Sequence, residues 1–201
     1  MPGHTWAIFL SEVVSGVRKV ISEMSTPAIK TKYNFCQYRS RLEAHWAAFF
    51  DLLGWEYEYE PYDLNGWIPD FALIGMNEIL VEVKPNFNFT DFDLNKIISA
   101  TKDTDKSKKE ILLLASTIFD GFYQDITIAP VIGWIGEYFY PGERIYFDEA
   151  ILNKNKGLYG FFHSSATKQD KMTGGFEITP PSTQEILGLW NTAKNKVMWN
   201  K

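Results

Sequence analysis

Cysteine is almost missing from this chain. Cys36 is the single cysteine among 201 residues, so the chain can form no internal disulfide and no zinc site that needs several cysteines. The three histidines, His4, His45 and His163, are too widely spaced to indicate a zinc site. One cysteine is also typical of a reducing compartment.

Long hydrophobic runs are missing as well. A helix that crosses a membrane needs about 20 nearly continuous apolar residues, and the longest apolar stretches, 111–119 and 126–136, are short and interrupted. The first residues, MPGHTWAIFLSEVV, lack the charged start, the long apolar segment and the cleavage site of a secretion signal. We therefore expect a soluble, cytoplasmic protein with no membrane partner.

Positive charge is scarce. The chain has 20 Lys and Arg against 25 Asp and Glu, a formal charge of −5, which disfavours a protein that coats nucleic-acid phosphates with a basic surface. The whole deficit falls in residues 1–100, which hold 8 basic and 13 acidic residues. The sequence thus collects carboxylates in its first half.

Three common catalytic motifs are absent. The chain contains no G-x-S-x-G, no G-x-x-x-x-G-K-[ST] and no G-x-G-x-x-G. The esterase, P-loop and Rossmann classes are therefore not indicated.

What remains is an ordinary globular composition, 45% hydrophobic and 16% aromatic, without repeats or a linker. The length favours a single domain over residues 1–201. Apolar residues at helical spacing predict helices over 6–24 and 38–53, the second stopped by Gly54. Weaker patterns beyond residue 120 predict strands over 126–135 and 144–147 and a helix over 183–194.

The middle of the chain predicts a mixed sheet. Alternating aromatic and Glu residues over 55–60 indicate a strand. Two further strands, 67–74 and 79–84, are separated by hairpin residues. A helix over 93–101 and a buried strand over 111–116 follow.

Charged residues come together in this hairpin. Glu82 and Lys84 share one face of their strand, because strand side chains alternate. The turn brings Asp70 back towards Glu82. Two neighbouring carboxylates repel each other unless a cation lies between them, and oxygen ligands select Mg²⁺, Mn²⁺ or Ca²⁺.

Glu43 is a third candidate acid. It lies three residues before Trp46 on the predicted helix, so it projects from the buried edge and could face the sheet. Taken singly, a helical Glu or a Glu/Lys pair on a strand is ordinary solvated surface. The argument therefore depends on the order and spacing of all four residues.

In order, the runs RSRLE (39–43), WIPDF (67–71) and VEVKP (81–85) resemble the PD-(D/E)XK nuclease superfamily. Eleven residues separate the Pro-Asp pair from Glu-Val-Lys. The resemblance covers about residues 38–116 and implies an α/β fold with a restriction-endonuclease-like core, a mixed central sheet flanked by helices. Residues 1–37 would then be an N-terminal helical extension, and 117–201 a C-terminal elaboration.

The resemblance implies hydrolysis of phosphodiester bonds in DNA with Mg²⁺, which Mn²⁺ is expected to replace. Asp70, Glu82 and the carbonyl of Val83 are implied metal ligands, and Glu43 holds the metal directly or through water. Lys84 is implied to orient or deprotonate the attacking water and to offset charge on the phosphorane. These roles agree with the physics of metal-assisted hydrolysis.

Four basic residues are candidates for DNA contact: Arg39, Arg41, Lys96 and Lys102. The two lysines belong to the helical segment after the motif strand, where a solvated surface is an equally good interpretation. The two arginines flank the start of the predicted helix over 38–53. Ordinary salt bridges to Glu56, Glu58 and Glu60 are their competing use.

Two alternative functions remain open. The chain resembles a nuclease subunit of a recombination or transposition complex that cuts only with a protein partner, which its negative charge favours. It could also be a catalytically vestigial binding or inhibitor protein with a nuclease fold. A homodimer is plausible, because double-strand cleavage needs two sites. The size and the missing signal suit a prokaryotic or viral accessory nuclease by analogy.

Overall fold

The computed structural model describes residues 28–85, 94–101, 110–123, 127–139, 144–164 and 169–198. The predicted helix over 6–24 and the candidate Lys102 lie outside these ranges. Within them, no helix has the length and apolar character needed to cross a membrane.

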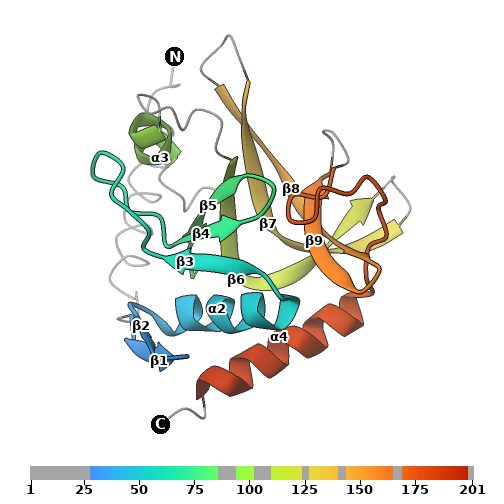
Figure 1. The fold of residues 1–201 in the computed structure, drawn as a ribbon, viewed down its shortest axis with the longest axis horizontal. Helices are drawn as coiled ribbons and strands as arrows, with labels where there is room; N and C mark the ends of the chain where they lie inside the picture. The colour runs from blue at the N-terminus through green and yellow to red at the C-terminus, as the bar shows by residue number, and fades with distance from the viewer. Residues whose placement is uncertain are drawn as a thin grey trace, which may run out of the picture.

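The described residues form an α/β fold around a seven-stranded mixed sheet (Figure 1). Its strand order is β3-β4-β5-β6-β7-β8-β9. β5 and β6 are parallel, and all other neighbours are antiparallel. The predicted α/β class and mixed sheet are thus confirmed. The strands are β3 (Glu56–Tyr59), β4 (Phe71–Ile74), β5 (Glu78–Val83), β6 (Glu110–Tyr123), β7 (Thr127–Phe139), β8 (Arg144–Asn155) and β9 (Leu158–His163).

Helices cover both faces of this sheet. α2 (Arg41–Leu53) and α4 (Thr183–Met198) pack against each other on one face, and α3 (Leu94–Thr101) lies on the other side (Figure 1). Alternate residues of β5 pack on opposite faces of the sheet. Val81 and Val83 join the core under α2, whereas Leu80 joins the cluster with Ile97 of α3. The predicted helix over 183–194 is confirmed and extends to Met198.

α2 starts later than its apolar pattern predicts. Ser40 caps it, because the hydroxyl accepts a hydrogen bond from the Glu43 amide at 3.1 Å. Gly54 ends it with a φ of 73°, the left-handed conformation that glycine adopts without strain. Trp46 anchors the buried stripe and donates from Nε1 to the Ala115 carbonyl at 2.9 Å.

The prediction that Tyr38 starts this helix is wrong. Residues Thr31–Tyr33 and Cys36–Tyr38 form a small antiparallel hairpin, β1 and β2, so this part of the expected N-terminal helical extension is not helical. Three-residue strands are too short to leave a period-two signature. The preceding Pro69 also confines β4 to Phe71–Ile74, shorter than the predicted strand over 67–74.

The strands of the C-terminal half are longer than the sequence predicts. The expected strands over 111–116 and 144–147 are parts of β6 and β8, the expected strand over 126–135 falls in β7 from Thr127 onward, and β9 has no counterpart among the predictions. The register shifts between Leu114 and Phe119 and between Val131 and Gly133, which breaks the alternation that reveals a strand. β6 to β9 continue the sheet that begins with β3.

Candidate active site

Asp70 lies immediately before β4 and is held from three sides. Its amide donates to the Val81 carbonyl at 2.8 Å, and its carbonyl accepts from the Glu60 amide at 3.0 Å. The side chain is almost fully buried, and Oδ2 accepts from the Val83 amide at 2.7 Å. Phe71 pairs with Val81 in the β4–β5 register, so one residue further places Asp70 opposite Glu82.

Glu82 and Lys84 lie side by side, as their spacing predicts. Lys84 Nζ donates to Glu82 Oε1 at 2.6 Å. The other carboxylate oxygen, Oε2, accepts from the indole Nε1 of Trp67 at 2.9 Å. The sequence did not predict this hydrogen bond, although Trp67 lies only three residues before Asp70.

Glu43 is buried in the first turn of α2 and faces the sheet, as predicted. Its Oε2 accepts from the Tyr59 hydroxyl of β3 at 2.6 Å and from the Arg39 amide at 3.1 Å. The Tyr59 oxygen also accepts from the Arg39 amide at 2.9 Å. Burial and the hydrogen bond to Glu43 raise the pKa of Tyr59 above its usual range, so this phenol remains a donor.

The three acids act on one another electrostatically. Burial, the charge of Glu82 and then the charge of Glu43 raise the pKa of Asp70 to about 7, against the opposing effects of the Val83 amide and Arg39. A nearby positive charge, or the loss of one of these negative neighbours, would stabilise the ionised form of Asp70.

Arg39 supplies positive charge to this cluster. Its guanidinium contacts Asp70 through Nη2, lies 2.8 Å from Glu60 Oε1 through Nε, and approaches Glu43 Oε2 at 3.9 Å. The salt-bridge role of Arg39 with Glu60 is therefore confirmed, whereas its predicted DNA contact is untested. We define the acidic cluster as Glu43, Glu60, Asp70 and Glu82.

The oxygen donors of this cluster are the type that Mg²⁺ prefers. However, among the residues with assigned positions, no group of three or more His, Cys, Asp and Glu side chains is arranged to hold a metal ion. The side chains explain this, because Asp70 accepts from Arg39 and Val83, and Glu82 from Trp67 and Lys84. These carboxylates fit Mg²⁺ once the Arg39 and Lys84 side chains release Asp70 Oδ1 and Glu82 Oε1, while the Val83 amide and the Trp67 indole keep Asp70 Oδ2 and Glu82 Oε2.

The remaining candidates lie apart from one another. Val83 contacts Asp70 through its amide, while its side chain joins the core. Arg41 lines a pocket of about 230 Å³ with residues of α4, including Lys194. Lys96 is exposed on α3, across the sheet from α2. Lys96 thus lies on the opposite side of the sheet from Arg41 (Figure 1).

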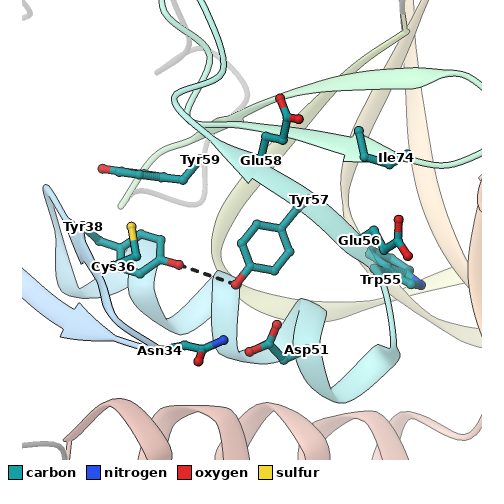
Figure 2. A pocket seen from close by; sticks show the side chains of 10 residues that line it. All are labelled: Asn34, Cys36, Tyr38, Asp51, Trp55, Glu56, Tyr57, Glu58, Tyr59 and Ile74. Atoms are coloured by element: carbon teal, nitrogen blue, oxygen red, sulfur yellow. Dashed lines mark hydrogen bonds between the residues drawn. The ribbon is translucent and has the colours of Figure 1, made fainter.

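A groove of about 650 Å³ borders Tyr59 on the side of the small hairpin (Figure 2). It runs between β2 and the edge strand β3, above α2 (Figure 2). Among the described residues, its lining includes three acids, Asp51, Glu56 and Glu58, and neither Lys nor Arg. The Tyr38 and Tyr57 hydroxyl oxygens in this lining lie 3.5 Å apart. The three carboxylates make the groove unfavourable for an anion.

Comparison of the chain with protein-family models, with curated proteins and with solved structures finds no match in any of the three.

Proposed function

We propose that the chain is a metal-dependent nuclease that hydrolyses phosphodiester bonds in DNA by the PD-(D/E)XK mechanism. One observation carries the proposal: burial and the charges of Glu82 and Glu43, which come from two other elements, raise the pKa of the Asp70 carboxyl to about 7. A divalent cation would relieve this repulsion.

The element order supports a restriction-endonuclease-like core. α2 precedes the antiparallel set β3, β4 and β5, α3 follows, and β6 then pairs parallel to β5. Asp70 lies immediately before β4, Glu82 lies in β5 and Lys84 directly follows it, and β5 is one strand of the parallel pair. This is the arrangement that the resemblance implies for residues 38–116.

Asp70, Glu82, the carbonyl of Val83 and Glu43 would hold Mg²⁺ or Mn²⁺. A cation held by these residues would supply a bound water of lowered pKa and positive charge next to the phosphate oxygens. Lys84 supplies a fixed ammonium that offsets charge developing in the transition state. Trp67 and Tyr59 orient the carboxylates of Glu82 and Glu43 through their hydrogen bonds.

The direct test is cleavage of supercoiled plasmid, linear duplex and single-stranded DNA in Mg²⁺, Mn²⁺ or EDTA. We expect cutting only with metal, and Lys84→Ala is expected to lower its rate about 100- to 1,000-fold. Lys196→Ala, which removes an exposed lysine of α4, is the matched control and should cut like the wild type. Metal-independent cutting, or full activity of Lys84→Ala, would contradict the proposal.

Trp67→Phe tests the orientation of Glu82. Loss of the indole donor is expected to weaken Mg²⁺ binding about 10-fold, the usual effect of removing an outer-shell partner. Trp55→Phe is the matched control, because Trp55 is also buried and donates to the Tyr159 carbonyl at 2.8 Å, away from the acidic cluster. Both variants should lose about 1 kcal/mol of stability. Calorimetric titration would reveal whether only Trp67→Phe loses metal affinity.

A second candidate function is a nuclease subunit that needs a protein partner to reach DNA. The acidic groove beside Tyr59 and the formal charge of −5 favour it, because neither attracts a phosphate backbone. In that case the purified chain should bind Mg²⁺ yet show no affinity for a DNA duplex at low salt. Tight binding to DNA by the chain alone would reject this candidate.

A further inference from the structure

We propose that Arg39 is a built-in counter-ion of the acidic cluster, which a divalent cation displaces and thereby frees to hold a DNA phosphate. This inference deepens the proposed function and rests on it. Arg39 would then be a positioning residue that couples metal binding to DNA binding.

The contacts of Arg39 divide into a backbone set and a side-chain set. Its backbone amide is held by Tyr59 Oη at 2.9 Å and by Glu43 Oε2 at 3.1 Å. Its guanidinium bridges Asp70 and Glu60, which belong to the segment around β3 and β4, and only approaches Glu43 Oε2, at 3.9 Å. The side chain can therefore leave the cluster while the backbone stays fixed beside the N-cap of α2.

Exposure makes this exchange physically reasonable. The Arg39 side chain is 51% exposed, whereas that of its partner Asp70 is 6% exposed, so the guanidinium reaches into the cluster from the solvent side. A divalent cation brings twice the charge to the same oxygens. Once displaced, a guanidinium is well suited to phosphate, since its planar donors match two phosphate oxygens.

Competition for Asp70 makes the two events reciprocal. Arg39 and a metal ion cannot both occupy Asp70 Oδ1, so each lowers the affinity of the cluster for the other. Removing the guanidinium should strengthen metal binding and weaken DNA binding. If the salt bridge were purely structural, removing the guanidinium would instead weaken metal binding or leave it unchanged.

The test is calorimetric titration of Mg²⁺ into the wild type, Arg39→Gln, Arg39→Lys and the control Lys32→Gln, which removes an exposed cation of β1, with melting in EDTA to verify folding. We expect about tenfold tighter Mg²⁺ binding for Arg39→Gln and an intermediate gain for Arg39→Lys, because one ammonium cannot reproduce the two-point bridge. Lys32→Gln should match the wild type. If Arg39→Gln fails to fold, Arg39→Lys decides the question by the same measure.

DNA affinity gives the second readout. In a Lys84→Ala background with Mg²⁺, we expect Arg39→Gln to bind a fluorescent duplex more weakly and to lower the salt slope by about one. Unchanged or weaker Mg²⁺ binding in Arg39→Gln, or an unchanged salt slope, would overturn this inference alone. If the wild type binds no Mg²⁺ through Asp70, the proposed function fails with it.

Discussion

Asp70→Asn is expected to raise the free energy of unfolding of the metal-free protein by about 2 kcal/mol at pH 8 and to abolish DNA cleavage. The native pKa of about 7 lies well above the ordinary value of 3.8, which corresponds to a cost of about 4 kcal/mol for the ionised carboxyl. That cost already includes the favourable charge of Arg39. Asparagine removes it but offers one acceptor oxygen in place of two to Arg39 and the Val83 amide, and the hydrogen bond left unmade offsets about 2 kcal/mol of the gain.

The raised pKa of Asp70 sets the direction in which the free energy of unfolding should change with pH. Since the native state holds the Asp70 proton more tightly than the unfolded state, the Asp70 contribution falls as pH rises from about 4 to 7 and is constant above pH 7. Asp70→Asn should lack this decrease. Glu56→Gln, which removes an exposed carboxylate of β3, should retain it.

Urea unfolding in EDTA at several pH values would measure both effects, and the same series in Mg²⁺ tests the metal. At pH 8, Mg²⁺ should stabilise the wild type and leave Asp70→Asn unchanged, because a ligand that binds only the native state raises its stability. A variant less stable than the wild type in EDTA at pH 8 would show that the Arg39 bond outweighs the repulsion from Glu82 and Glu43.

Gly133→Ala is expected to destabilise the protein by about 3 kcal/mol. Gly133 follows the register shift in β7, and a Cβ at this position would lie 2.0 Å from the Leu113 carbonyl oxygen of the neighbouring strand. That oxygen belongs to the backbone of a central strand, so the clash cannot be relieved by a side-chain rotation. Gly188→Ala is the matched control.

At Gly188, on the exposed side of α4, no atom lies within 4 Å of an added Cβ. There alanine should raise stability by about 0.5 to 1 kcal/mol, since it reduces the freedom of the unfolded chain. Chemical denaturation of both variants provides the measurement. Equal stability of Gly133→Ala and the wild type would mean that β6 and β7 can separate at this bulge without cost.

Local patterns were sufficient for the elements that carry the candidate site. The apolar stripe with Trp46 predicted α2, and alternation predicted that Glu82 and Lys84 share a face while Val81 and Val83 point to the other, where the structure buries them. The turn between β4 and β5 then brought Asp70 towards Glu82, as the hairpin chemistry implied. These features depend on residues close in sequence, whose spacing determines which faces they share.

The tertiary structure decided what surrounds those residues. Arg39 meets Asp70 across 31 positions of sequence, Tyr59 meets Glu43 across 16, and Trp67 meets Glu82 across 15. No periodicity reports such pairs, because they form only when separate elements pack together.

The strand predictions failed where the alternating pattern is too short or is interrupted. β1 and β2 are too short to show alternation, and the bulges of β6 and β7 interrupt it. The sequence alone determined which carboxylates and which lysine face one another along the β4–β5 hairpin. The tertiary structure decided that the Arg39 guanidinium, the Trp67 indole and the Tyr59 phenol contact the carboxylates. These contacts form only in the folded chain, where α2 and the residues that flank the strands pack against that hairpin.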